Sequence, residues 1–160
     1  MSNPFINLQS LVKAQLQTVS TLAVCPILSE DPGDPLNTAY LALFRGALPV
    51  NTNGQTGLAA LVSLWNGKPS DGDDRITLPM MRLGIRITVF ENIPVNRDPA
   101  AGTNLSGLDA TWAIISGLHG FSFGPGQAPI AFAGFDTESS PTEPILAWNI
   151  DFELVTAVSN

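Results

Sequence analysis

A large apolar side chain at every second position from Met81 to Val89 is the feature that most constrains the fold of this chain. A period of two residues is that of a β-strand, in which successive side chains point to opposite faces of a sheet. The run therefore predicts a strand with one face in a hydrophobic core. The members of that face are Met81, Leu83, Ile85, Ile87 and Val89, and those of the other face are Arg82, Gly84, Arg86, Thr88 and Phe90.

The same alternation returns near the C-terminus, where it predicts a last strand over Ile145 to Val158. Its apolar side chains favour a core face, and its polar ones favour contact with solvent or a partner. Three less regular apolar runs predict further strands. They are Ala23 to Leu28, LAALVSLW from Leu58 to Trp65, and Ile130 to Asp136.

Three helices are predicted from apolar residues at steps of three and four. The first has its buried side at Leu8, Leu11, Val12, Leu16, Val19 and Leu22. The second begins at Asp34-Pro35 and ends at Gly46, with a cap, a first-turn proline and a terminal glycine. Thr103 or Asn104 can cap the third, which ends at His119-Gly120 and whose predicted buried positions are Leu105, Leu108, Trp112, Ile115 and Leu118.

The elements follow the order α-β-α-β-β-α-β-β, with the polar stretch Asn66 to Asp74 as a long loop. This order predicts an α+β fold: a largely antiparallel β-sheet with helices packed on one face. A length of 160 residues suits one domain, residues 1–160.

Charge and hydropathy exclude several classes of partner. The net charge is −7 and no cluster of Lys and Arg is present, so we expect no specific binding of nucleic acid. No segment reaches the roughly 18 apolar residues of a membrane span, and the first residues, MSNPFINLQ, lack the pattern of a secretion signal. A soluble, non-secreted chain is expected.

The residues that could carry chemistry form no recognisable catalytic or metal-binding set. Cys25 is the only cysteine and lies in the apolar run LAVCPIL, which indicates a buried side chain and excludes an internal disulfide. His119, the only histidine, comes at the predicted end of a helix, where it suits the helix dipole. Asp71, Asp73 and Asp74 lack the spacing of a calcium loop. We expect no catalytic site, no cofactor and no metal, and we expect Trp65, Trp112 and Trp148 to be core residues.

The stretch that follows the alternating strand has two interpretations. It carries Glu91, Asn92, Asn96, Arg97 and Asp98, and it contains the prolines Pro94 and Pro99. It either shapes the connection from strand to helix or forms part of a contact between subunits. In both cases Asn92 and Asn96 tolerate unusual backbone angles, and Arg97 pairs with Asp98 or with a neighbour. With Arg82 and Arg86, these residues are the candidate subunit or partner interface.

Several of these segments together resemble the tail terminator, or tail completion, proteins of long-tailed bacteriophages and prophages. The likeness spans about Leu8 to Ala157, and its most distinctive part runs from Glu91-Asn92 through Asn96-Arg97 and Gly102-Thr103 to Leu118-His119-Gly120. The other segments that carry it are the DPGDP loop with its helix, the strand MMRLGIRITVFEN, and the last strand, ILAWNIDFELVTA.

The resemblance implies a structural virion protein without enzymatic activity or cofactor. It implies a homo-oligomeric ring, usually a hexamer, that caps the tail tube, ends its polymerisation and offers an interface to the neck and connector proteins of the head. Such a protein would be assembled in the host cytoplasm and located in the tail or neck of the virion. DNA would pass through the ring, and an acidic wall would repel it rather than hold it.

Two alternatives remain open on the sequence. One is another head-tail connector or neck subunit of the same particle. The other, from a different class, is a small-ligand binding module or a hydrolase that uses the acidic loops. On the ring interpretation, replacing Arg97 by Ala should impair assembly and leave the monomer folded.

Overall fold

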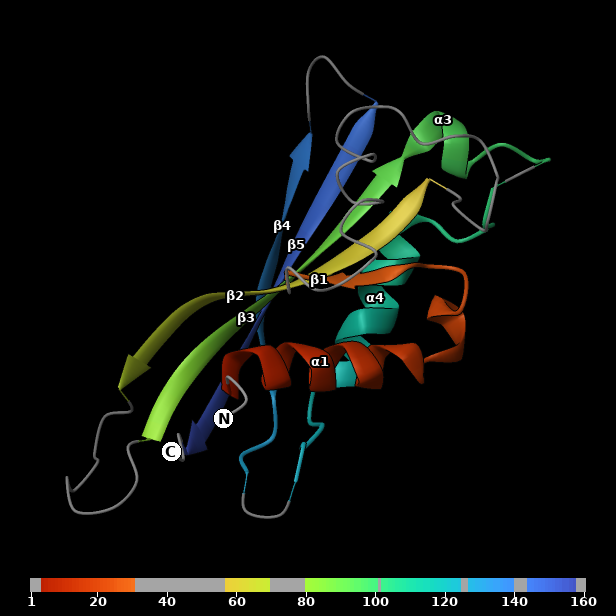
Figure 1. The fold of residues 1–160 in the computed structure, drawn as a ribbon. Coiled ribbons are helices and arrows are strands. Elements are labelled where there is room, and N and C mark those ends of the chain that lie inside the picture. Colours follow the sequence, from red (N-terminus) through yellow and green to blue (C-terminus); the bar gives the residue numbers. More distant parts are fainter. Residues whose placement is uncertain are drawn as a thin grey trace.

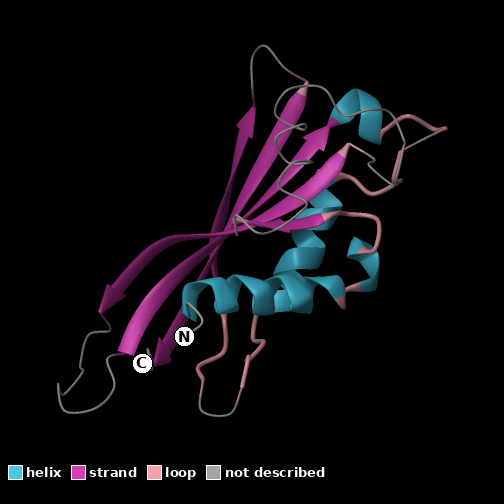
Figure 2. Cartoon of the chain, in the orientation of Figure 1, coloured by secondary structure: helices cyan, strands magenta, loops and turns pink. Residues whose placement is uncertain are grey.

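A computed structural model of the chain describes residues 4–30, 57–69, 80–100, 102–124, 127–139 and 144–157. It has the predicted α+β fold, built on a single mixed sheet (Figures 1 and 2). The predicted second helix and the cluster of Asp71, Asp73 and Asp74 lie outside the described residues. The elements are α1 (Pro4–Gln17), the 3-10 helix η1 (Ser20–Leu22), β1 (Ile27–Ser29), β2 (Leu58–Pro69), β3 (Met80–Asn92), α3 (Ile93–Asn96), α4 (Gly107–Leu118), β4 (Ala131–Ser139) and β5 (Ile145–Ala157).

The five strands are arranged in the order β1-β2-β3-β5-β4. The pair β1 and β2 is parallel, and every other neighbouring pair is antiparallel. The two strands with the strongest alternation, β3 and β5, are neighbours along their whole length, from Met80 opposite Ala157 to Asn92 opposite Ile145. They form the centre of the sheet, and β4 is an outer strand.

One face of the sheet packs against α1 and α4 and holds the main core, as the alternation predicts. Ile85, Ile87 and Ile150 of the sheet belong to the same buried cluster as Val12 of α1 and Ile114 of α4. We call the opposite side, against which none of the described helices of the core cluster packs, the open face. It has a small apolar cluster at one end, made of Leu28, Ala59, Leu61 and Phe90. The remainder is polar, and its residues include Arg82, Arg86, Thr88, Asn149, Asp151 and Glu153.

The first helix is shorter than predicted. It ends at Gln17, because Thr18 donates its N–H and its hydroxyl to the carbonyl of Gln15 and so closes the last turn. The next residues form η1, which still buries Leu22. The prediction that Leu11 is buried is wrong, since 39% of its surface is exposed. The strand predicted from Ala23 begins only at Ile27.

The third predicted helix is α4, and its cap and its buried side both differ from the prediction. Ser106, rather than Thr103 or Asn104, is the N-cap, and its hydroxyl accepts the N–H of Asp109. Asn104 instead takes a positive φ of 58°. The buried positions are Gly107, Ala110, Thr111, Ala113, Ile114 and Leu118.

Small residues on α4 explain this difference. A Cβ at Gly107 would lie 2.0 Å from the ring of Trp148, so the helix can approach β5 only with glycine there. The sheet therefore meets the side of α4 with Gly107, Ala110 and Thr111. Leu108 and Trp112, which are larger, are turned outward and are 58% and 69% exposed.

Both outer parts of the sheet extend further than the sequence predicts. Strand β2 continues through Asn66 to Pro69, which the sequence assigns to a loop. Strand β4 continues to Ser139, and almost all its side chains are exposed. The helical turn α3 occupies residues for which the sequence predicts an irregular loop.

Candidate functional site

The residues proposed from sequence as an interface fall into two groups. Glu91, Asn92, Asn96, Arg97 and Asp98 lie at the end of β3 and in the turn that follows it. Arg82 and Arg86 lie on the open face.

Glu91 is the centre of the first group, and its side chain is fully buried. One carboxylate oxygen accepts hydrogen bonds from Asn96 Nδ2 at 2.8 Å and Arg97 Nε at 3.1 Å. The other accepts the N–H of Gly107 at 3.1 Å, at the start of α4. A buried carboxylate requires such donors. Glu91 therefore joins β3, α3 and α4.

Asn96 extends this network towards α4. Its amide nitrogen also donates to the carbonyl of Leu105 at 2.9 Å, and its oxygen accepts the hydroxyl of Thr103 at 2.7 Å. Its backbone is helical, within α3. The sequence suggested that Asn96 is present for an unusual backbone angle. The hydrogen bonds show that the fold instead uses the side chain of Asn96. An unusual backbone angle is also the wrong interpretation for Asn92, whose φ is −85°.

The electrostatics of Glu91 favour its charged form. Burial by itself raises the pKa of the carboxyl, but hydrogen bonds from Arg97, Asn96 and Gly107 and the charge of Arg97 outweigh it, so the pKa lies below its usual value. The sequence suggested that Arg97 pairs with Asp98 or with a neighbour. In the structure Arg97 pairs with Glu91. Asp98 accepts the N–H of Ala100 instead.

The first group is thus divided by depth. Glu91, Asn92 and Asn96 are buried, and their side chains hold the strand-to-helix connection together within one chain. Arg97 and Asp98 are exposed and accessible to another molecule. This division could not be read from the sequence, because a buried carboxylate with three donors has the same local pattern as a solvated loop.

On the open face, the charges of β3 are paired with those of β5. Arg86 makes two hydrogen bonds of 2.8 Å to the carboxylate of Asp151, which raise its pKa. Its guanidinium also lies 5.2 Å from the centre of the Trp65 ring. Arg82 lies 3.6 Å from Glu153, and both side chains are half exposed. Next along the face, Thr88 donates to Asn149 at 2.8 Å.

Cys25 and His119 are the cysteine and the histidine that the sequence offers for nucleophilic chemistry. Cys25 is buried as predicted, and burial raises its pKa to about 12, so that the thiol is protonated at neutral pH. The Nδ1 atom of His119 accepts the N–H of Phe132 at 3.2 Å. In the described ranges, no group of three or more His, Cys, Asp or Glu residues could hold a metal ion.

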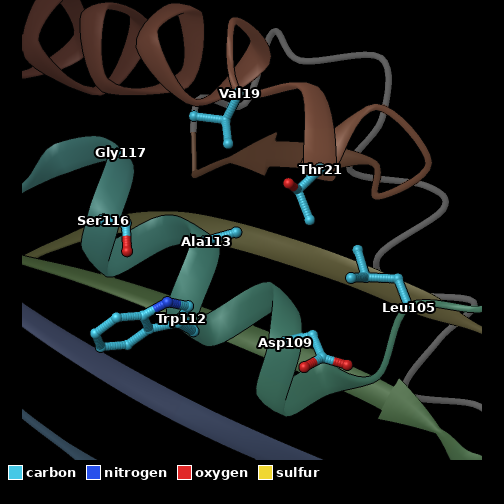
Figure 3. Close-up of a pocket in the computed structure, with 8 residues that line it drawn as sticks. All are labelled: Val19, Thr21, Leu105, Asp109, Trp112, Ala113, Ser116 and Gly117. Atoms are coloured by element: carbon cyan, nitrogen blue, oxygen red, sulfur yellow. The ribbon is translucent and has the colours of Figure 1, made fainter.

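An exposed apolar surface on α4 was missed by the sequence analysis. Figure 3 shows the shallow pocket there, between α4 and the segment around η1, with Trp112 along one side. Its cavity volume is about 550 Å³, and it is lined by Val19, Thr21, Leu105, Asp109, Trp112, Ala113, Ser116 and Gly117. Trp65, on β2, is also exposed, at 52%. Of the three tryptophans predicted to be core, only Trp148 is buried.

The fold can now be compared with known proteins. The chain is similar in fold to a chain of a gene transfer agent virion. The solved structure is described as "Virion of native gene transfer agent (GTA) particle", and the alignment covers 98% of this chain and 100% of that one, with a TM-score of 0.58 and 16% identity. At this identity the likeness is one of fold. No protein-family model and no curated protein matches the sequence.

A search for membrane-spanning helices among the described residues found no helix that is long and apolar enough.

Proposed function

We propose that this chain is a tail terminator: a structural virion protein that forms a ring of six copies on the end of a tail tube and stops its polymerisation. The observation that carries this proposal is the likeness to a gene transfer agent virion chain, which extends over the full length of both chains. The resemblance of its sequence motifs to tail terminators supports the same kind of particle. In this function the chain has no substrate and acts through its surfaces.

A second candidate is another head-tail connector or neck subunit of the same kind of particle. The full-length likeness supports it as well, because the description of that structure names the whole virion rather than a position in it. Both candidates require contacts with copies of the chain or with other virion proteins. A tail terminator additionally binds tube protein and limits its growth.

The accessible members of the predicted interface are Arg82, Arg97 and Asp98. We assign contacts with a neighbouring subunit, tube protein or neck protein to these three. Glu91, Asn92 and Asn96 act indirectly, because they hold the backbone that presents Arg97 and Asp98. Arg86 is engaged by Asp151 and Trp65 and has the same supporting role on the open face.

Electron microscopy of tube protein polymerised with and without this chain tests the proposal. A terminator gives tubes that stop growing and carry a ring at one end. Replacing Arg97 by Ala should reduce the fraction of capped tubes, whereas replacing Gln127, an exposed residue away from this loop, should not. Tubes that grow without limit and carry no ring in the presence of the wild-type chain would reject a terminator. Rings that bind connector protein and leave tubes unaffected would favour the neck subunit.

A further inference from the structure

As far as the described residues show, the sheet has two incompletely paired edges, one on each side. Strand β4 pairs with β5 on one side, and among the described residues no strand pairs with its other side. At the opposite edge, β1 covers only Ala60 to Val62 of β2. Beyond Val62, β2 continues to Pro69, and in the part of the chain that the structure describes only β3 pairs with it there. Exposed strand edges invite pairing with another chain, and proteins usually block them.

We propose that β4 of one copy pairs with the Ser63–Pro69 segment of β2 in the next copy, so that the sheet continues from subunit to subunit around the ring. The proposal rests on the ring proposed above and names the contact that closes it. In a ring with rotational symmetry, every copy of β2 runs in the same direction. Strand β4 runs opposite to β5, and β5 runs in the direction of β2. The new pair would therefore be antiparallel, like most of this sheet.

The hydrogen bonds of β4 show which of its backbone groups point outward. Phe132 donates its N–H to His119 and not to β5. In an antiparallel pair, residues whose backbone N–H and C=O groups point to the partner strand alternate with residues whose groups point away from it. Past the bulge between Phe132 and Gly134, the outward positions are those opposite Ile150, Trp148 and Leu146 of β5. They are Phe135, Thr137 and Ser139.

The outward positions of β2 follow in the same way. Ala60 donates its N–H to Pro26, and the carbonyl of Val62 accepts the N–H of Glu30, so both residues face the β1 side. The next residues of the same phase, opposite Ile85, Leu83 and Met81 of β3, are Leu64, Gly67 and Pro69. Pro69 has no N–H, so at its outward position it can offer a neighbouring strand only its carbonyl.

One register satisfies both strands. Placing Thr137 opposite Gly67 of the next copy aligns outward groups with outward groups. It also puts Asp136 opposite Lys68, and both positions belong to the open face, by their pairing with Asn149 and Arg82. Pairing of β4 with a second β4 would instead bring the acidic residues Asp136 and Glu138 of two copies together. Cross-strand pairs of opposite charge stabilise a sheet, and like charges destabilise it.

The register also gives a reasonable geometry for a closed ring. Within one copy Thr137 is level with Ala60, through Trp148 and Val89. Moving to Gly67 therefore shifts each copy along the strands by about six residues, once the bulge in β2 is subtracted, or roughly 20 Å. Because β4 lies directly beside β2 of the next copy, equivalent strands of neighbouring copies are separated by four strand spacings, through β3, β5 and β4, or roughly 19 Å. The strands would then tilt by about 45° from the ring axis, at the upper end of the roughly 35–45° of closed barrels.

Disulfide cross-linking tests this register. The double variant Lys68→Cys/Asp136→Cys places two thiols in directly opposed positions, close enough for a bridge. Mild oxidation of assembled protein, with tube protein present where assembly requires it, should give a ladder of covalent oligomers up to the complete ring on a non-reducing gel. Each single variant and the wild-type chain, whose Cys25 is buried, should remain monomeric on that gel.

The outcomes separate this contact from the proposed function. Covalent dimers from Asp136→Cys alone would indicate a symmetric contact between two β4 strands and overturn the proposal. Rings seen by microscopy without a ladder would overturn the edge pairing and leave the terminator in place. A wild-type chain that forms no ring, alone or on tubes, would overturn both.

A second pair of variants tests the backbone itself. Thr137→Pro removes an outward N–H without removing a bond to β5, and should abolish rings while circular dichroism shows a folded chain. Thr137→Ala keeps that N–H and should assemble like the wild type. Normal rings from Thr137→Pro would reject the pairing.

Discussion

Glu91 illustrates at the scale of one residue how a polar side chain can serve the fold rather than a reaction. Its carboxylate is buried, and donors from α3 and from the start of α4 surround it. Leaving buried donors unsatisfied costs about 1–3 kcal/mol in general. The sequence placed Glu91, Asn96 and Arg97 in one functional loop, and the structure does bring them together. The sequence could not indicate which of these side chains were buried, because their burial depends on the later segment from Thr103 to Gly107.

Replacing Glu91 by Gln should therefore destabilise the chain by about 1–3 kcal/mol, since the amide keeps the shape but loses the charge that its donors stabilise. Chemical denaturation measures the change, with Glu138→Gln, at an exposed position, as the control. An equal effect of the two substitutions would contradict the role given to Glu91.

The same residue predicts a dependence on pH. The pKa of Glu91 is lowered on folding, so its contribution is complete above the usual carboxyl pKa of about 4.3. It is lost as the pH falls through the lower pKa of the folded state. The difference in unfolding free energy between wild type and Glu91→Gln should consequently be largest near neutral pH and shrink on acidification. A difference that stays constant down to the acid unfolding of the protein would argue that the charge contributes nothing.

At the scale of elements, periodicity predicted the strands well and the exposed side of α4 poorly. Alternation in β3 and β5 is a local property with one solution, because a shift of one residue would turn every side chain to the wrong face. A helix, by contrast, can present several overlapping rows of apolar residues to the core. On α4, the stripe of large residues through Leu108 and Trp112 competes with a stripe of small ones through Gly107 and Ala110. Close contact with Trp148 decides for the small stripe.

Trp148, which takes part in this contact, and Trp112, which is turned outward, should consequently differ in their effect on stability. Trp148→Ala removes a buried ring and should cost about 3–5 kcal/mol. Trp112→Ala removes an exposed one and should change stability by no more than about 0.5 kcal/mol. Thermal and chemical unfolding of both variants provide the measurement. A large loss from Trp112→Ala would mean that α4 packs on the sheet by its other side.

At the scale of the whole molecule, the distribution of charge bears on the passage of DNA through the proposed ring. The chain carries a net charge of −7. On the open face, Arg82 and Arg86 are each paired with a carboxylate of β5, while Asp136 and Glu138 add negative charge on β4. If the continued sheet turns this face to the lumen, the described part of the wall would offer duplex DNA no arginine without a carboxylate partner. Binding to the phosphate backbone requires such groups.

Rings of the wild-type chain should therefore leave duplex DNA unbound at a salt concentration of about 0.15 M, whereas rings with Glu138→Lys and Glu153→Lys should retain it. Retention should weaken steeply as salt is added, and Glu138→Gln with Glu153→Gln should not produce it. A comparison of linear with circular DNA shows whether the DNA binds in the lumen or on the outside of the ring. Linear duplex can thread a preformed ring, closed by the disulfides described above, and a covalently closed circle cannot. Binding of linear DNA alone would place the open face in the lumen, and equal binding of circles would place it outside.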